Sequence, residues 1–517
     1  IKSRSIGQND FWTMLLAFPQ PSTNGILYVN KNANSGSRLG NSWENALTEL
    51  PQALKIASVN SSVKQIWVAK GTYFPTTTGD RTISFEVPSG IKLYGGFAGT
   101  ENAVEERQLK VNPTILSGDL NNNDDTNYAN MDDNSFHIMK LHYANSETLI
   151  DGFIFSAGRS DQFGYTGDFD NKKGPAIYNY ASSPTIINCI FTTNYADHDG
   201  AGIYNVQNST PKIYNSLFTN NRANYGGAIL NTSGSYSEVV NCTFTYNSVM
   251  GSNRGVSIYN QNSSGGSLKN SILWDNSDDA HIINENSTFL VTDNIIKGGY
   301  NTDDGQNRIY NTDPLLNIAV EDYYSLKKES PAIGKGENTA LPEHILTDIF
   351  GKKRIRGAKI DMGAQEYIGE KPVFSGFANI DKTYGDADFA FPVPTSNSDG
   401  TFTFKNGNTN IAEIYDNGFS KYVNIKGAGQ TVIKAIQKET EYFQSDSIGL
   451  LLEIAKANAV LTLKINGTAY NEVNLAEAAY GDEKIFSYET NSDANFTDIS
   501  FDLLDDYLDP YIDFSNL

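Results

Sequence analysis

Short apolar runs separated by asparagine, glycine and serine recur with a regular period in the middle of this chain. Four copies of one pattern begin at Gly174, Gly200, Gly226 and Gly255, so they start 26, 26 and 29 residues apart. Each copy holds three apolar runs of strand length, which in the first copy are 176–178, 185–187 and 189–191. A period in the twenties with strand-like runs predicts a solenoid, in which each copy forms one turn of a rod.

Three strands per turn with asparagine at the corners predict a right-handed parallel β-helix. Successive turns of such a rod pair as parallel strands about 4.8 Å apart, so equivalent side chains stack in columns. We therefore expect a ladder of side-chain hydrogen bonds through Asn179, Asn205, Asn231 and Asn260.

The only two cysteines occupy equivalent positions on turns that are two rungs apart. Ser216 holds the position between Cys189 and Cys242. Two rungs correspond to about 9.6 Å, which exceeds the roughly 7 Å that a disulfide can span between Cα atoms. We expect two free, buried thiols that pack as small apolar side chains, rather than a redox or metal-binding pair.

Flanking segments extend the predicted rod in both directions. Runs 91–97, 114–118 and 149–155 look like earlier turns, and 294–299 looks like a later one. Residues 47–57 have the apolar spacing of a helix, which we expect to cap the first turn. A cap is needed because an uncovered strand edge pairs with other chains.

Composition adds the setting and excludes some partners. The 517 residues favour two to four domains, and 29 Tyr and 27 Phe with only 19% charged residues are typical of an extracellular β-protein. A net charge of −21 offers no basic stripe to phosphates, so we expect no nucleic acid partner. No apolar run is long enough to span a membrane. Because the chain starts at Ile1 and stops after a strand-like run, we expect a processed or partial polypeptide.

Motifs at both ends of the predicted rod resemble those of parallel β-helix surface proteins of the Bacteroidota, of the choice-of-anchor type. The resemblance covers roughly residues 27–368. The opening motifs are Leu27–Asn30, Gly40–Leu50, Ile66–Tyr73 and Leu116–Asn121, and the closing motifs are Asp313–Leu316, Asp322–Leu326, Ser330–Gly334, Asp348–Arg354 and Ile360–Glu366.

The residues after 368 resemble a different module, the bacterial immunoglobulin-like MBG domain. The motifs are Lys382–Phe389, Ile411–Ile414 and Val423–Val432, and Ala479–Asp482 echoes part of the first. Alternating strands with turn signals independently predict a β-sandwich. The chain is thus expected to be all-β, with an N-terminal extension at 1–26, a β-helix at 27–368, an Ig-like β-sandwich at 369–455 and the start of a second one at 456–517.

A β-helix followed by Ig-like domains is similar to the large adhesins of gliding bacteria, which the type IX secretion pathway exports. The resemblance implies a head on spacers, at the outer surface of the cell, that binds glycans or other surfaces without catalysis. The apolar segment Phe11–Phe18 is not explained by it. This segment either caps the open end of the rod or docks on a partner protein of the secretion or motility machinery.

Parallel β-helices also include polysaccharide lyases and glycoside hydrolases, so an enzyme is the alternative function. Both reactions need carboxylates that converge on one face, or a carboxylate beside a basic group. The best candidate is Asp197-His198-Asp199, with Asp170 and Arg222 as expected neighbours. We favour a solvated corner loop for these residues, because membership of a fold does not establish catalysis.

An acidic loop is the candidate metal site. Its oxygen-bearing side chains copy the first half of a calcium loop, although the glycine and the closing glutamate of an EF-hand are missing. We expect a structural calcium ion here, with a solvated acidic loop as the alternative. The expected ligands are Asp119, Asn121, Asn123 and Asp125, with Asp132 and Asp133 as possible additions.

The loop 156–173 is the candidate ligand-binding surface. Aromatic rings beside acids and an arginine are what a sugar-binding surface uses, because rings stack on sugars and polar groups bond their hydroxyls. Loops on a rigid scaffold are also where function concentrates. The candidate residues are Arg159, Asp161, Phe163, Tyr165, Asp168 and Asp170.

Overall fold

The computed structural model describes residues 19–125, 128–161, 173–275, 277–300, 308–318, 323–416, 418, 420–440 and 442–456, with the backbone of 461–465, 468–470 and 486–490. The chain divides into two compact units that meet between Ile368 and Gly369, and each is described by itself. The apolar segment Phe11–Phe18 lies outside the described residues. No helix among the described residues is long and apolar enough to cross a membrane.

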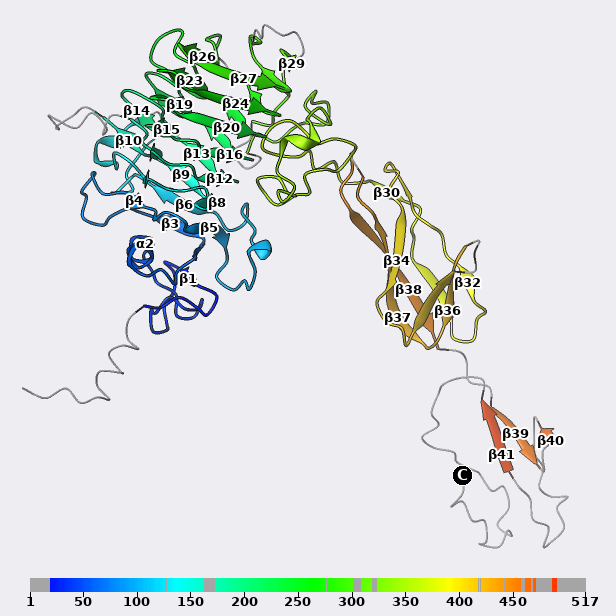
Figure 1. Ribbon diagram of the computed structural model, residues 1–517. Helices are drawn as coiled ribbons and strands as arrows, with labels where there is room; N and C mark the ends of the chain where they lie inside the picture. Colours follow the sequence, from blue (N-terminus) through cyan, green and yellow to red (C-terminus); the bar gives the residue numbers. More distant parts are fainter. Residues whose placement is uncertain are drawn as a thin grey trace, which may run out of the picture. The chain divides into compact units, whose positions relative to one another are not determined.

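The first unit is a parallel β-helix, as the repeat predicts (Figure 1). Three long parallel sheets run along it, with nine, nine and seven strands, and neighbouring strands in the central part come from successive turns. Sheet 1 contains β1 (Ile26–Val29), β2 (Gln65–Ala69), β5 (Lys92–Phe97), β8 (Leu149–Asp151), β12 (Thr185–Ile187), β16 (Lys212–Tyr214), β20 (Tyr236–Val240), β24 (Gly265–Lys269) and β27 (Thr288–Thr292). Sheet 2 contains β3 (Gly71–Tyr73), β6 (Thr114–Ser117), β9 (Ile154–Ser156), β13 (Ile190–Thr192), β17 (Leu217–Thr219), β21 (Thr243–Thr245), β25 (Ile272–Leu273), β28 (Asn294–Ile296) and β29 (Ile309–Tyr310). Sheet 3 contains β4 (Phe85–Glu86), β7 (Met139–His142), β11 (Ile177–Tyr180), β15 (Ile203–Val206), β19 (Ile229–Asn231), β23 (Ile258–Gln261) and β26 (Ile282–Glu285).

The central turns contain a fourth strand that the apolar pattern does not reveal. Sheet 4 contains β10 (Arg159–Ser160), β14 (Tyr195–Ala196), β18 (Arg222–Ala223) and β22 (Ser248–Val249). Three of these strands follow a buried asparagine that bonds the next rung, Asn194 to Asn221 at 2.9 Å and Asn221 to Asn247 at 3.0 Å. The expectation of three strands per turn is therefore wrong here, because the asparagine column holds two more residues in register without any apolar run.

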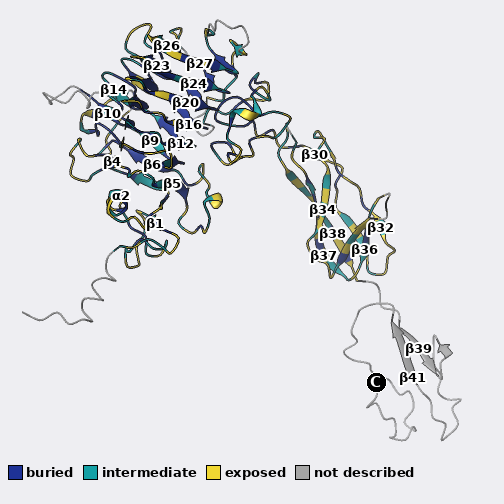
Figure 2. Cartoon of the chain, in the orientation of Figure 1, coloured by how far each residue is buried: buried dark blue, intermediate teal, exposed yellow. Residues whose placement is uncertain are grey.

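Columns of like side chains fill the interior of the rod. The rings of Phe155, Phe191, Phe218 and Phe244 are fully buried and stack nearly parallel, with centroids 5.0, 4.6 and 4.7 Å apart. Burying one such side chain contributes roughly 1.5–3 kcal/mol. Figure 2 shows the buried strands of the rod in dark blue.

The predicted asparagine ladder is confirmed. The side-chain amides of Asn179, Asn205 and Asn231 each donate to the next carbonyl along, at 2.9, 2.8 and 2.7 Å, and Asn260 continues the ladder to Asn284 at 2.8 Å. All but Asn284 are fully buried, so each rung satisfies a polar group that would otherwise be costly to bury.

A third column of asparagines makes the corners between sheets 1 and 2. Asn188, Asn215, Asn241 and Asn270 have φ angles between 47° and 54°. Asparagine tolerates this left-handed region better than most residues, which explains its return at the same place in every copy.

Both cysteines are free and buried, as expected. Burial raises the pKa of each thiol to about 12. The backbone N–H of Cys189 donates to the Ser216 hydroxyl at 3.3 Å, which places the serine on the rung between Cys189 and Cys242.

The helix α2 (Leu50–Val59) packs Leu50, Ala53, Leu54 and Ala57 into the core at the first turns. It begins three residues later than expected, because Leu47 pairs with β1 and Pro51 stands in the first turn of the helix. Three 3-10 helices, η1 (Val104–Glu106), η3 (Met131–Asp133) and η6 (Asn338–Ala340), lie in excursions from the described turns.

Residues 323–368, which we call the return segment, run back over the outside of the rod. Leu341, Ile345 and Ile360 pack against the outer face of sheet 1, and Ile349 packs against that of sheet 2. A fully buried arginine holds the segment together. The Arg354 guanidinium donates to the carbonyls of Gly363 at 2.6 Å and Ala364 at 3.2 Å, and its Nε lies 3.2 Å from Glu366.

The second unit is a β-sandwich of mainly antiparallel strands with its own core, which includes Val423, Ile433, Leu450 and Leu452. One sheet contains β31 (Ile380–Thr383), β38 (Asp446–Ala455), β37 (Gly429–Gln437) and β34 (Phe402–Asn406), and the other contains β32 (Phe389–Ala390), β36 (Lys421–Ile425) and β35 (Ala412–Asp416). Short pairs are made by β30 (Phe374–Ser375) with β33 (Thr395–Ser396), and further strands are β39 (Leu461–Ile465), β40 (Thr468–Tyr470) and β41 (Phe486–Thr490).

Candidate functional site

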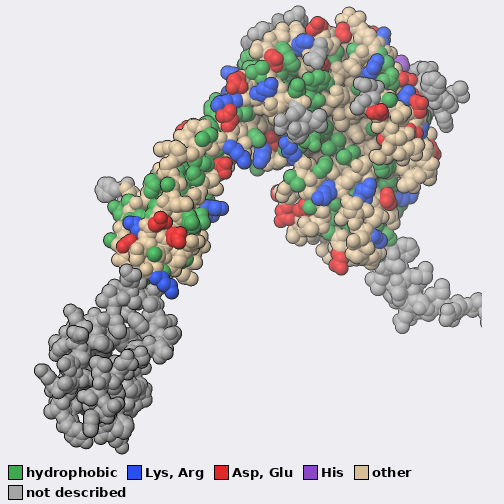
Figure 3. All heavy atoms as spheres, turned by 180° about the vertical axis from the view of Figure 1, so that it is seen from behind, with side chains coloured by type: hydrophobic (Ala, Val, Ile, Leu, Met, Phe, Trp, Pro, Cys, Tyr) green, Lys and Arg blue, Asp and Glu red, His purple; other side chains and the backbone are tan. Residues whose placement is uncertain are grey.

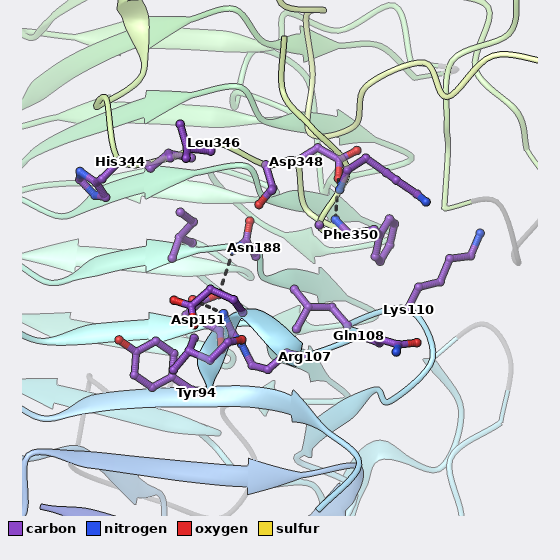
Figure 4. A pocket seen from close by; sticks show the side chains of 18 of the residues that line it. Tyr94, Arg107, Gln108, Lys110, Asp151, Asn188, His344, Leu346, Asp348 and Phe350 are labelled. Carbon is purple, nitrogen blue, oxygen red and sulfur yellow. Dashed lines mark hydrogen bonds and ion pairs between the residues drawn. The ribbon is translucent and has the colours of Figure 1, made fainter. Parts of the chain in front are cut away.

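One column of outward-facing side chains on sheet 1 opens into a cleft. At the cleft the column consists of Tyr94, Asp151 and Ile187, which pair in register on β5, β8 and β12. The cleft has a volume of about 710 Å³ and lies between the excursion 104–111 and the return-segment residues 344–352 (Figure 4). A rigid sheet therefore forms its floor, and two loops form its walls.

An ion pair fixes one wall of the cleft to its floor. Nη2 of Arg107 lies 2.8 Å from Oδ2 of Asp151, and both side chains are about nine-tenths buried, with 10% and 9% exposed. The other carboxylate oxygen accepts the Asn188 amide at 2.9 Å. Arg107 also donates to the Gly95 carbonyl at 3.1 Å and lies 5.1 Å from the centre of the Tyr94 ring. We call Arg107, Asp151 and Asn188 the clasp. The ion pair compensates both charges and pre-organises the site, because charge-assisted hydrogen bonds hold side chains in one geometry.

The rim of the cleft offers rings, a cation and an imidazole. Burial, with a smaller effect from Asp151, raises the pKa of Tyr94 to about 12, so its hydroxyl keeps its proton. The exposed Lys110 lies 5.8 and 5.9 Å from the ring centres of Tyr323 and Phe350, and forms no ion pair with any described residue. His344 and Leu346 stand on the opposite wall in Figure 4.

The second buried carboxylate of the cleft closes a turn. Asp348 accepts backbone N–H groups from Phe350 at 2.9 Å, Lys352 at 2.8 Å and Glu366 at 3.0 Å. Burial nevertheless raises its pKa. Asp151 and Asp348 thus both hold protein groups in place, and what the cleft presents to a ligand is stacking surface and hydrogen-bonding groups, the combination that binds sugars.

The predicted catalytic residues form a corner that covers the outside of sheet 3. His198 lies 2.8 Å from Asp199 and Lys173 lies 3.9 Å from it, and Asp199 is only 3% exposed. Arg222 faces elsewhere, over the ring of Tyr195. Asp197 is half-buried at the same corner, and Asp170 lies outside the described residues.

Two of the predicted ligand-binding residues belong to an ion network. Asp161 lies 2.7 Å from Arg81 and 3.2 Å from Arg159, and Arg159 also lies 2.7 Å from Asp132. The remaining candidates lie outside the described residues, namely Phe163, Tyr165, Asp168 and Asp170.

The predicted calcium ligands make contacts within their own loop. The Asp119 carboxylate accepts the N–H groups of Asn123 at 3.1 Å and Asp124 at 3.0 Å, and the Asn121 N–H donates to Asp133 at 3.1 Å. The backbone of Asp125 pairs with Ala129.

Asp124, which the sequence does not single out, has the most perturbed carboxyl of this loop. Its pKa is raised to about 6, chiefly by burial and to a smaller extent by the charges of Asp119 and Asp133, against a hydrogen bond from Asn134. No group of three or more His, Cys, Asp or Glu suited to a metal ion occurs among the described residues. The calcium ion stays a prediction.

Sequence reasoning missed the cleft, although part of the signal is present in the chain. Once the register is known, Asp151 occupies a column position where the next turns carry Ile187, Tyr214 and Val240. A buried carboxylate in an apolar column needs a group that compensates its charge, and here that group is Arg107. The return segment forms the other wall of the cleft, and the repeat pattern does not predict that it lies there.

Comparisons with known proteins agree with the architecture of the rod. A family model described as a right handed beta helix region matches residues 176–309, the part of the chain where the repeats are clearest. No curated protein matches the chain significantly. The solved crystal structure of pectate lyase Pel9A is 14% identical, with 66% of this chain and 96% of that chain covered and a TM-score of 0.29. A likeness this distant says nothing about activity, so what the comparisons establish for this chain is a β-helix region.

Proposed function

We propose that this chain is the binding part of a surface adhesin, and that the cleft on sheet 1 holds a glycan without cleaving it. The observation that carries the proposal is the cleft of about 710 Å³, which offers ring, amide and cationic groups from two loops over the floor of a rigid sheet. Its two buried carboxylates, Asp151 and Asp348, are occupied by structural contacts. The third carboxylate that lines the cleft, Glu105, is exposed on the excursion wall. Binding without turnover fits this arrangement better than glycoside hydrolysis, which uses a pair of carboxylates that both reach the substrate.

We also propose that the protein is displayed at the outer surface of the cell, exported by a type IX pathway and acting in adhesion or gliding. The Ig-like unit would be a spacer, and the N-terminal extension would contact the secretion or motility machinery. The support for this is the order of the motifs and the resemblance to gliding adhesins.

A glycan panel tests the cleft. The double variant Lys110→Ala/His344→Ala removes two exposed rim groups and leaves the clasp intact. Tyr143→Ala is the matched control, because Tyr143 is 71% exposed but lies at the end of β7. We expect binding by the parent chain and the control, and a loss of roughly tenfold or more in the double variant. Equal binding by all three proteins would refute the cleft as the site.

The same panel tests the absence of turnover. New reducing ends or unsaturated products that disappear in Asp199→Ala or Asp151→Asn would show a hydrolase or lyase and replace the adhesin proposal. Bound glycan with no product, over hours at high protein concentration, is the expected result.

We also propose a structural calcium ion in the loop 119–133. The support is the crowding of Asp119, Asp124 and Asp133, whose mutual repulsion a cation would relieve. Calcium titration should raise the melting temperature of the rod, and Asp124→Asn should abolish that rise. No shift in the parent protein would remove the site.

A further inference from the structure

A second surface of the rod, beside sheet 4, carries arginines over tyrosine rings. The guanidinium carbon of Arg222 lies 5.9 Å from the ring centre of Tyr195, and that of Arg254 lies 4.7 Å from the ring centre of Tyr225. We call these four residues the Arg–Tyr ridge. A cation over an aromatic face is held by the ring quadrupole and lies flat on it.

The two arginines of the ridge have no counter-ion among the described residues. Arg222 is exposed and Arg254 is half-buried, and neither forms an ion pair or a side-chain hydrogen bond with any residue that the structure describes. Two other basic residues of this region do have counter-ions, because Arg159 is paired with Asp161 and Lys173 with Asp199. The ridge is therefore locally positive in a chain whose net charge is −21.

On the face that Figure 3 draws, acidic and basic side chains are interspersed rather than gathered into a patch of one sign. With such a surface, an anion is recognised by local groups at contact distance rather than by long-range attraction.

The chemistry of the ridge favours a carboxylate or a sulfate. When a guanidinium lies with its face on a ring, its edge remains available, and this edge presents parallel N–H groups that match two oxygens of an oxyanion. Lysine, a point charge, lacks this fork.

The spacing of the ridge favours a polymer over a small anion. Tyr195 and Arg222 pair on successive turns, and the Arg254 carbonyl accepts the N–H of Gly226 from the turn before it. The two arginines lie on successive turns but in different columns, because Arg222 pairs with Ser248 on the next turn whereas the Arg254 backbone meets Gly226. Successive turns rise by about 4.8 Å. A polymer that carries several acid groups can reach both cations at once, and linked contacts reinforce one another.

We propose that the Arg–Tyr ridge binds an anionic polysaccharide, bearing uronate carboxylates or sulfates, across two successive turns of the rod. The inference rests on the proposed glycan-binding function but uses a different surface from the cleft. It also predicts a salt-sensitive interaction, since exposed charges are screened by ions.

Binding of immobilised full-length chain to polymers of defined chemistry tests the ridge. The probes are alginate for carboxylates, dextran sulfate for sulfates, dextran as the neutral polymer and polyglutamate as an acidic polypeptide. We expect alginate or dextran sulfate to bind, to weaken strongly between low and high salt, and to lose roughly tenfold or more in affinity in Arg222→Ala/Arg254→Ala. The better of the two probes tells carboxylate from sulfate.

Two further variants separate recognition from bulk charge. Arg222→Lys/Arg254→Lys keeps the charge and removes the fork, so we expect it to bind more weakly than the parent chain. Lys405→Ala/Lys434→Ala removes two exposed, directly opposed lysines from β34 and β37 in the second unit, and should bind like the parent. Unchanged melting temperatures verify that the variants fold.

Three results would overturn the inference. They are equal anionic-polymer binding by the Arg222→Ala/Arg254→Ala variant and the parent, equal loss in the Lys405→Ala/Lys434→Ala control, and binding of polyglutamate as tight as that of the polysaccharides. Failure of the cleft is a separate outcome, because Lys110→Ala/His344→Ala leaves the ridge intact.

Discussion

The buried pair Asp275 and His281 should give the stability of the rod a characteristic pH dependence when either partner is replaced. The two side chains are 5% and 2% exposed, and Oδ1 of Asp275 lies 3.8 Å from Nε2 of His281. Among the described residues, Nε2 of His281 and Oδ2 of Asp275 have no hydrogen-bond partner, while the other ring nitrogen of His281 lies 2.8 Å from the Ser257 hydroxyl. Burial therefore disfavours the charged form of each group.

The magnitudes follow from the two pKa shifts. Burial raises the pKa of Asp275 from 3.8 to about 6 and lowers that of His281 from 6.5 to about 4. Each shift is worth about 3 kcal/mol at most, taking about 1.4 kcal/mol for each pKa unit.

The two contributions have opposite signs. Between pH 4 and 6 the folded chain holds a proton on Asp275 that the unfolded chain has released, so this contribution to stability falls as the pH rises. Over nearly the same range the unfolded chain holds a proton on His281 that the folded chain lacks, so that contribution falls as the pH drops. In the parent protein the two slopes largely cancel.

Each single substitution leaves one of the two titrating groups, so the pH dependence of that group's contribution to the free energy of unfolding can be measured alone. Relative to the double variant Asp275→Asn/His281→Gln, the variant Asp275→Asn should lose up to about 3 kcal/mol as the pH falls from 6.5 to 4, and His281→Gln should gain a similar amount. Comparison with the double variant removes the contribution of all other titrating groups to the pH dependence of stability. Urea unfolding followed by tryptophan fluorescence reports the rod alone, because all four tryptophans precede Ile368. Identical pH slopes for Asp275→Asn, His281→Gln and the double variant would refute the reasoning.

Three further predictions concern the clasp, the ladder and the thiols. Arg107→Met should lower the free energy of unfolding by roughly 3–5 kcal/mol in urea, because it leaves the buried Asp151 uncompensated, and Asp151→Leu in the same chain should restore part of the loss. Asn231→Leu removes buried amide hydrogen bonds on both sides of one rung and should cost roughly 2–4 kcal/mol, whereas a cost near zero would mean that the ladder is not stabilising. Cys189 and Cys242, with pKa values raised to about 12, should react with a thiol reagent only after denaturation, and prompt labelling of the native chain would contradict their burial.

The rod could be predicted because its physics is local and repeated. The corner asparagines mark left-handed turns, the apolar runs mark strands, and a fixed period sets the register, so the ladder through Asn205 and the separation of Cys189 from Cys242 both follow from counting residues. The fourth sheet escaped because two-residue strands such as β14 carry no apolar pattern. Their register comes from Asn194, whose partner lies one turn away.

The cleft escaped for a different reason. Its walls come from excursions that begin at positions 104 and 344, and no local pattern says that two segments so far apart in sequence meet over one column of sheet 1. Only the clasp leaves a trace, since Asp151 interrupts an apolar column.

Repetition itself explains where function can arise in this rod. Equivalent turns present equivalent side chains, so a unique pocket forms only where a non-repeated segment meets a column, as the return segment does beside Asp151. The Arg–Tyr ridge instead places two similar Arg–Tyr pairs on successive turns, which a polymer can contact together and a single small anion cannot. The cleft and the ridge therefore predict two different kinds of binding, one selective for a short glycan segment and one for the charge and length of a chain, and the variants of the two surfaces should lose them independently.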